Sequence, residues 1–243
     1  MRRPIAAQLW SVFTLDDFPG VLRQLGEMGY AGVEAFGLHD LSPTVVRQLL
    51  DDLGLELFSS HAPFPAGPDA KRILDEQSQL GAPVLAWSLE AEEFATEDSI
   101  ARGVVRVNEG AANAKAYGMQ IAYHNHWSEF SRLADGRRAY DVLQERLSPD
   151  VLLELDVYWA AVAGADPAAV VREYGDRVRF LHLRDGPAKT AEDAMVAVGQ
   201  GSLDIPAILD ANPSVAWHIV ELDHCDTDVM TALRESFDYL NAL

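Results

Sequence analysis

The sequence is poor in cysteine and in basic residues. Cys225 is the single cysteine among 243 residues, which excludes an intramolecular disulfide and a zinc site built from several cysteines. Lys and Arg number 19 against 38 Asp and Glu, so the formal charge is −19. Because such an acidic surface repels phosphate, we expect neither nucleic acid nor an anionic membrane as a partner.

Long hydrophobic runs are also missing. No apolar run reaches the roughly 18 residues of a membrane-spanning helix, and the apolar segment 5–10 is too short for the core of a secretion signal. With 49% hydrophobic and 23% charged residues, the chain is too apolar to be disordered. We therefore expect a globular, cytoplasmic protein in a reducing compartment.

Short apolar runs alternate with longer amphipathic stretches along the whole chain. Eight runs are predicted to be strands: 5–10, 32–36, 56–60, 84–87, 120–123, 151–156, 178–183 and 216–222. Eight units over 243 residues give about 30 residues per unit, the size of one strand–helix step. No Asn-Gly or Asp-Gly turn joins two of these strands, so a parallel sheet is favoured over hairpins.

An open doubly wound sheet and a closed (β/α)₈ barrel both fit this alternation. The number of units and the length favour the (β/α)₈ TIM barrel. The open sheet is weakened because no Gly-rich dinucleotide fingerprint follows the first strand. Since no linker or change of composition interrupts the chain, we expect one domain over 1–243.

Several helix starts are visible in the sequence. Residues 14–17 resemble a capping box with Thr14 as the N-cap, and Ser42 before Pro43 predicts a second start. Thr96 precedes a helix expected to reach about Tyr117, and a last helix is expected within 226–243.

Polar residues gather where the predicted strands end, which is where a barrel of this kind carries its active site. Five of the seven histidines lie in or just after strands, and all of these except His218 lie at the carboxyl end. Side chains alternate across a strand. The polar residues that share an inward face opposite leucines are Glu154 and Asp156, His182 and Arg184, and Glu221 and Asp223.

Buried carboxylates and imidazoles cost several kcal/mol unless they are paired. A divalent cation is one such partner, because imidazole with carboxylates is a usual ligand set for Zn, Mn and related ions. A single Asp at a strand end is more often a helix N-cap, and a single strand histidine is more often a core residue. The matching alternation on the last four strands favours a metal site over both.

These residues lie in strings that resemble the xylose isomerase-like (β/α)₈ superfamily. This is the sugar phosphate isomerase/epimerase group, which also contains AP endonucleases and inosose dehydratases. The resemblance covers the C-terminal half closely and the N-terminal half only in spacing. The strings are Ile121-Ala-Tyr-His-Asn-His126, Leu153-Glu-Leu-Asp-Val-Tyr-Trp159, Leu181-His-Leu-Arg-Asp185, Val198-Gly-Gln-Gly-Ser-Leu-Asp204 and Val220-Glu-Leu-Asp223.

The resemblance implies one divalent metal ion (Mn, Mg or Zn), held by residues of strands five to eight. The implied ligands are His124, Asp156, His182 and Glu221. The sequence departs from the family at His124, where many epimerases have the glutamate that handles a proton on the second face. It departs again at Trp159, where related enzymes often have a histidine.

The implied reaction is proton abstraction next to a carbonyl of a sugar or keto-polyol. Glu221 is the expected base, and His126 or His61 the expected second acid or base, although His126 could equally be a hydrogen-bond partner. Expected substrate-binding residues are Glu34, Arg184, Trp10 and Trp159; Glu34 could instead pair with Arg184.

Few basic residues lie near the strand ends, so an unphosphorylated carbohydrate is the favoured partner. The loop 199–202 could still present amides to an anion. Assembly into a homo-oligomer stays open.

Four functions compete for this sequence. A metal-dependent sugar isomerase or epimerase is favoured, and a lyase that dehydrates an inosose or eliminates from a 3-keto sugar is the main alternative. An AP-endonuclease-like hydrolase needs a basic DNA groove that the charge of −19 argues against. A non-catalytic sugar-binding barrel would be expected to lack some of the metal ligands, whereas the implied set is complete in this sequence.

Overall fold

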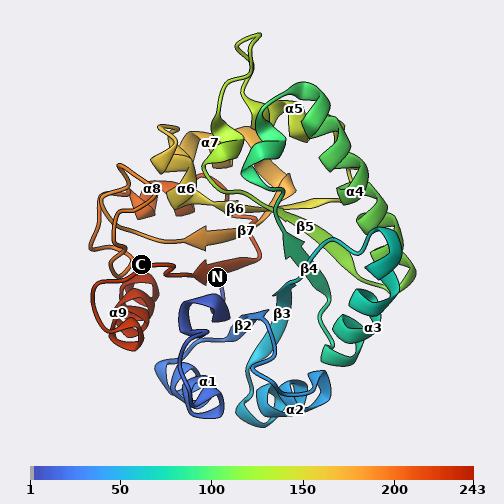
Figure 1. The fold of residues 1–243 in the computed structure, drawn as a ribbon. Helices are drawn as coiled ribbons and strands as arrows, with labels where there is room; N and C mark the ends of the chain where they lie inside the picture. The colour runs from blue at the N-terminus through green and yellow to red at the C-terminus, as the bar shows by residue number, and fades with distance from the viewer. Residues whose placement is uncertain (1–2) are drawn as a thin grey trace.

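Eight parallel strands close into a barrel in the computed structural model, which describes residues 3–243 (Figure 1). Met1 and Arg2, the start of the predicted domain 1–243, lie outside the described residues. The strands are β1 (Ile5–Gln8), β2 (Gly32–Phe36), β3 (Glu56–His61), β4 (Val84–Trp87), β5 (Gln120–His124), β6 (Leu152–Asp156), β7 (Val178–Leu183) and β8 (Trp217–Val220). Pairing of β1 with β8 excludes an open sheet, so the expected single-domain (β/α)₈ barrel is confirmed.

At least one helix follows every strand and packs outside the barrel (Figure 1). The α-helices are α1 (Phe18–Met28), α2 (Pro43–Leu53), α3 (Ala70–Leu80), α4 (Glu97–Ala116), α5 (Ala139–Arg146), α6 (Val157–Val162), α7 (Pro167–Tyr174), α8 (Ile205–Asp210) and α9 (Val229–Ala242). The 3₁₀ helices are η1 (Leu9–Val12), η2 (Gly67–Asp69), η3 (Ala91–Phe94), η4 (Ser128–Phe130) and η5 (Gly175–Arg177). Within residues 3–243, no helix has both the length and the apolar character needed to cross a membrane.

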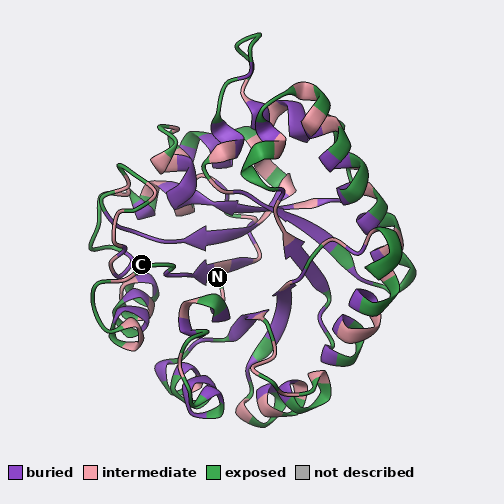
Figure 2. Cartoon of the chain, in the orientation of Figure 1, coloured by how far each residue is buried: buried purple, intermediate pink, exposed green. Residues whose placement is uncertain are grey.

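The apolar core has two layers, inside and outside the sheet. The strands are buried, whereas the outward faces of the helices are exposed (Figure 2). Small and large side chains fill the barrel interior together: Ala6, Phe58, Val84, Ala86, Ala122, Phe180, Trp217 and Ile219. Leu153 and Leu155 pack in the outer layer, as expected from the alternation on β6. The interior is therefore apolar at one end, and the polar inward residues are left for the other.

The first helix starts later than the sequence suggested. The expected N-cap at Thr14 is wrong: Asp17 caps α1, and its Oδ1 accepts a hydrogen bond from the Gly20 amide at 3.0 Å. Pro19 explains the difference, because a start at Thr14 would place its ring inside the helix, where it breaks the hydrogen-bond ladder. The predicted caps Ser42 and Thr96 are confirmed.

Replacing Asp17 with alanine should lower the free energy of unfolding by about 1 kcal/mol, because the Gly20 amide loses its acceptor. For a chain of this length the melting temperature should fall by about 2–4 °C. Thr14→Ala is the matched control and should change stability little, since Thr14 is exposed and outside the helix. Equal losses in the two variants would contradict the assignment of the cap.

Candidate active site

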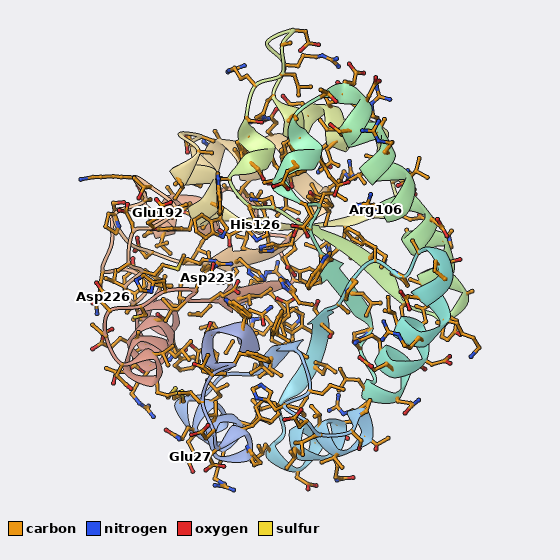
Figure 3. The ribbon with its side chains drawn as sticks, viewed as in Figure 1. Glu27, Arg106, His126, Glu192, Asp223 and Asp226 are labelled. Carbon is orange, nitrogen blue, oxygen red and sulfur yellow. The ribbon has the colours of Figure 1, made fainter. Side chains whose placement is uncertain are left out.

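A cavity of about 550 Å³ lies over the carboxyl ends of the strands. It contains most of the residues that the sequence singled out: His61, His124, His126, Arg184, Glu221, Trp10 and Trp159. Phe36, Trp87, Trp127 and Asp223 also line it. In Figure 3, His126 and Asp223 lie toward the middle of the view, whereas Glu27 and Arg106 belong to the outer helices α1 and α4.

Three predicted site residues lie beneath the cavity rather than on its wall. Glu34, Asp156 and His182 are fully buried and touch the residues above them. These three side chains do not line the cavity themselves and contact residues that do.

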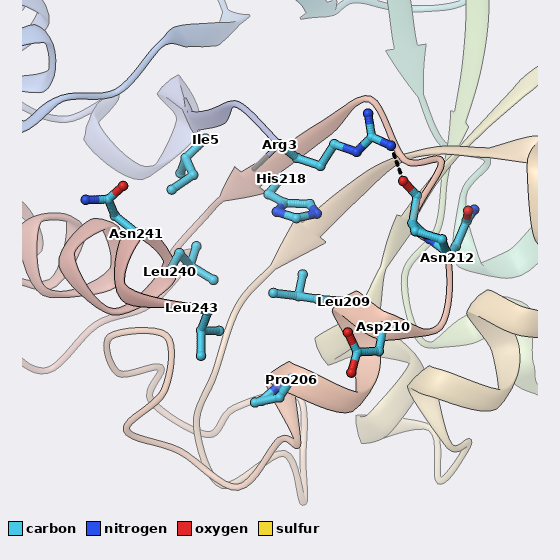
Figure 4. A pocket seen from close by; sticks show the side chains of 11 residues that line it. Arg3, Ile5, Pro206, Leu209, Asp210, Asn212, His218, Leu240, Asn241 and Leu243 are labelled. Carbon is cyan, nitrogen blue, oxygen red and sulfur yellow. Dashed lines mark hydrogen bonds between the residues drawn. The ribbon is translucent and has the colours of Figure 1, made fainter. Parts of the chain in front are cut away.

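A second cavity of about 600 Å³ lies beside β8, α8 and α9 (Figure 4). Its wall includes Arg3, which donates a hydrogen bond to the Pro213 carbonyl, and His218. His218 is the one strand histidine that the sequence placed away from the carboxyl ends. Among residues 3–243, the groups of His and carboxylates able to hold a metal ion lie at the other cavity, which is therefore the candidate active site.

Arg184 joins three carboxylates at the floor of this cavity. Its Nε lies 2.6 Å from Asp156 Oδ2 and its Nη2 lies 2.6 Å from Glu221 Oε2, while Nη1 pairs with Asp223. The guanidinium also lies over the ring of Trp159, 5.4 Å from its centre. Burial raises the pKa of Asp156 to about 6, although Arg184 acts against this rise. Burial also raises the pKa of Glu221, but Arg184 and His182 lower it by more, so this carboxylate is ionised.

Asp156 has a second role. Its Oδ1 accepts a hydrogen bond from the Trp159 amide at 2.9 Å and caps α6. The N-cap interpretation of this residue and its place beside Arg184 are therefore both realised, one through each carboxylate oxygen.

His182 contacts carboxylates through both ring nitrogens. Its Nδ1 lies 2.6 Å from Glu221 Oε2, and its Nε2 lies 2.7 Å from Glu34 Oε2 and 3.1 Å from Glu154 Oε1. Burial lowers the pKa of His182, yet Glu154, Glu34 and Glu221 outweigh it and hold that pKa well above its usual range.

Next to the cavity floor lies a group that we call the inner cluster: the lining residues His61 and His124 and the fully buried Glu34 and Glu154. The Oε1 atom of Glu154 lies 2.8 Å from His61 Nε2 and 3.1 Å from His124 Nδ1. Glu34 Oε2 lies 3.4 Å from His61 Nε2 and accepts a hydrogen bond from Gln8 at 2.9 Å. The alternative interpretation of Glu34, a pairing with Arg184, is wrong, because Arg184 lies one layer higher and binds other carboxylates.

The imidazoles at the cavity differ in their electrostatic surroundings. Burial, together with the charge of Arg184, lowers the pKa of His126 to about 4, so His126 is neutral near neutral pH. Burial also holds the pKa of His124 well below its usual range. Burial lowers the pKa of His61 too, but Glu34 and Glu154 reverse that effect and raise it.

Two overlapping groups could hold a metal ion. The first consists of Asp156, His182 and Glu221, and the second of His61, His124, Glu154 and His182. Three of the four predicted ligands thus come together, while His124 turns its Nδ1 toward Glu154. No role at the site was predicted for Glu154, although it shares the inward face of β6 with Asp156.

The loop 199–202 does not present free amides to an anion. The carboxylate of Asp185, fully buried after β7, accepts hydrogen bonds from the amides of Gly199 and Gly201, both at 3.0 Å. It also accepts from the amides of Gly186 and Leu203. An internal carboxylate therefore occupies the position that a phosphate would need.

Two curated relatives cover most of this chain. One is 2-epi-5-epi-valiolone 7-phosphate 2-epimerase of Actinoplanes sp., 27% identical over 220 residues, covering 87% of this chain and 74% of the relative. The other is inosose dehydratase of Geobacillus kaustophilus, 24% identical over 253 residues, covering 86% and 80%.

Solved structures share the fold at lower identity. A sugar phosphate isomerase/epimerase from Parabacteroides distasonis superposes with a TM-score of 0.83 at 22% identity, covering 100% of this chain and 94% of the other. The IOLI protein, described with a bound zinc atom, superposes with a TM-score of 0.79 at 16% identity, covering 98% and 96%. The family model for the xylose isomerase-like TIM barrel matches residues 22–240, and the chain belongs to that family.

Proposed function

We propose that this protein is a divalent-metal-dependent isomerase or epimerase that abstracts a proton next to a carbonyl of a sugar or keto-polyol. The observation that carries the proposal is one cavity whose wall includes Glu221 and His126, where Glu221 joins the buried Asp156 and His182 in a group able to hold a metal ion. Relatives named as an epimerase and as inosose dehydratases support a substrate of the sugar or cyclic polyol class.

The residues present fit a divalent ion. Asp156, His182 and Glu221 offer one imidazole and two carboxylates, with ligand atoms within 4.8 Å of one another. This donor set suits Mn, Mg or Zn, with imidazole favouring Zn, and a zinc atom is named in the IOLI structure. His124, the fourth ligand implied by the resemblance, lines the same cavity but directs Nδ1 at Glu154. When bound, the ion supplies a Lewis acid that polarises the carbonyl group.

Glu221 and His126 are the proposed proton acceptors. Arg184 and His182 hold Glu221 ionised, and burial holds His126 neutral, so near neutral pH both are in the unprotonated form that a base requires. His61 lines the same cavity, and its raised pKa suits the acid that returns a proton.

The aromatic wall suits a carbohydrate. Trp10, Trp127 and Trp87 present indole rings to the cavity, where the apolar faces of a sugar ring can stack. Arg184 presents a guanidinium at the floor and is the proposed donor to substrate oxygens. Trp159 packs against that guanidinium and holds its orientation.

A lyase of the inosose dehydratase or 3-keto-sugar type is the second candidate. The inosose dehydratase relatives favour it. His124 also favours it, because many epimerases of the family have at this position the glutamate that handles a proton on the second face during inversion. Both reactions begin with the same proton abstraction and differ in whether a leaving group departs afterward.

Incubation of the metal-loaded protein with a panel of keto-sugars and inososes in D₂O tests the proposal. We expect deuterium at the carbon next to the carbonyl, entering with a single stereochemistry, because His124 stands where many epimerases of the family have the glutamate that handles a proton on the second face. Proton NMR reads the exchange, and product mass separates isomerisation from loss of water.

His126→Ala and His61→Ala serve as comparisons in this assay. Loss of product with retained exchange in either variant would identify the residue that returns the proton. Absence of exchange with every keto-sugar and inosose tested would contradict the proposed reaction. Efficient exchange from both faces in both variants would restore a two-sided epimerase.

A further inference from the structure

Two fully buried carboxylates of the inner cluster lack a Lys or Arg partner. Within residues 3–243, the ion-pair partners of Glu34 and Glu154 are all imidazoles, namely His61, His124 and His182. Arg184 is engaged one layer higher by Asp156, Glu221 and Asp223. Uncompensated charge is costly in a barrel interior, so the inner pair needs positive charge from elsewhere.

Three imidazole nitrogens converge on one oxygen of Glu154. His61 Nε2, His124 Nδ1 and His182 Nε2 lie 2.8, 3.1 and 3.1 Å from Glu154 Oε1. Ligands about 2.1 Å from a common ion lie about 3.0 Å apart in octahedral and about 3.4 Å apart in tetrahedral geometry. The spacing of these atoms is therefore that of neighbouring ligands around one ion.

One oxygen atom in each of these two carboxylates is buried without a hydrogen-bond donor among the described residues. Neither Glu34 Oε1 nor Glu154 Oε2 has a hydrogen-bond partner within the described part of the chain, and both side chains are completely buried. Buried carboxylate oxygens without donors are uncommon, and a cation beside these two carboxylates compensates their charge.

Protons on two of the imidazoles could supply the same charge. The rings, however, are close to one another: His61 and His182 are 5.5 Å apart, and His124 is 5.0 Å from His61 and 4.6 Å from His182. A divalent ion held by neutral imidazoles supplies two positive charges at one point and places no two charged rings side by side.

His182 can ligate an ion through only one nitrogen, because a neutral imidazole has one lone pair. Its Nδ1 faces the group of Asp156 and Glu221, which leaves Nε2 as a donor to Glu34 and Glu154. The inner cluster keeps three ligands of its own without His182: His61, His124 and Glu154.

We propose that the inner cluster is a second divalent-cation site, distinct from the group of Asp156, His182 and Glu221. His61 Nε2, His124 Nδ1 and Glu154 Oε1 are its ligands, and Glu34 supplies the second negative charge. This site is beyond the single ion of the proposed function, and an ion bound there would hold His61 Nε2, so that His61 could not return a proton through that nitrogen. Its imidazole-rich donor set suits Zn²⁺ or Co²⁺ rather than Mg²⁺.

Metal content of the whole chain tests the proposal. The chelator-stripped protein is loaded with Co²⁺ or Zn²⁺, desalted, and analysed by elemental mass spectrometry. We expect about two ions per chain in the wild type and about one in Glu154→Gln, which keeps the shape but removes the charged ligand. Glu129→Gln is the matched control and should keep about two ions, because Glu129 is equally buried but contacts Tyr123 and Ser128 instead.

Asp156→Asn separates this site from the proposed catalytic one. We expect it to keep the inner ion and lose the outer one. An ion lost in Glu154→Gln but kept in Asp156→Asn supports the inner site even if only one ion binds. A single ion whose binding is unchanged in Glu154→Gln overturns the inner site and leaves the proposed function standing.

Crystals of the wild-type protein give a test that needs no variant, in case Glu154→Gln fails to fold. Anomalous diffraction at the metal edge should show a peak within bonding distance of His61 Nε2, His124 Nδ1 and Glu154 Oε1. A peak found only beside Asp156 and Glu221 overturns the proposal.

Discussion

Replacing Glu221 with glutamine should reduce turnover about a thousandfold and leave the metal content close to that of the wild type. Glutamine keeps the shape and one oxygen donor but cannot accept a proton. The oxygen that contacts Arg184 Nη2 and His182 Nδ1 can be retained by the amide, so the floor of the cavity should keep its arrangement. The loss should therefore appear in kcat rather than in metal binding.

Asp223→Asn is the matched control for this variant. Asp223 also lines the cavity and pairs with Arg184, but its side chain is 28% exposed and is absent from both metal-ligating groups. We expect a much smaller loss of turnover than in Glu221→Gln. Near-native turnover in Glu221→Gln, measured with the substrate identified by the exchange assay, would show that the base lies elsewhere.

The strands could be predicted because each one is a short apolar run between amphipathic segments. Their ends depend on local contacts that composition does not reveal. The first strand was expected to continue to Trp10, but β1 ends at Gln8. The Oε1 atom of Gln8 accepts a hydrogen bond from the Trp10 amide at 2.9 Å and caps η1. A side chain that turns back on its own backbone ends the strand there.

The inward residues of the site could also be predicted, since alternation along a strand fixes which face a side chain occupies. Their partners could not, because closure of the barrel decides them. His61 and Glu154 are 93 positions apart and meet across the barrel at 2.8 Å. Glu34 was expected to bind substrate or, as the alternative, to pair with Arg184, yet it lies in the layer of His182, two residues before Arg184.

Arg184 pairs with three carboxylates at the cavity floor, and its removal should strongly destabilise the protein. In Arg184→Met, Asp156 and Glu221 stay buried at 3% exposure or less and lose their guanidinium partner. Breaking a buried ion pair on one side typically costs about 3–5 kcal/mol. Urea unfolding of the chelator-treated protein should show a loss of this size.

A second substitution and a change of pH test the electrostatic origin of that loss. The loss of stability in Arg184→Met combined with Glu221→Gln should be smaller than the sum of the losses in the two single variants, because the glutamine removes one of the buried charges left without a partner.

The pKa of Asp156 is already raised by burial to about 6, and loss of Arg184 removes an interaction that lowers it. A carboxyl group whose folded-state pKa is raised destabilises the fold at pH values above its unfolded pKa, and protonation relieves this cost. The difference between Arg184→Met and the wild type should therefore be smaller at about pH 5 than at about pH 8. A loss that is additive with Glu221→Gln and independent of pH would mean that Arg184 acts through packing against Trp159 rather than through its charge.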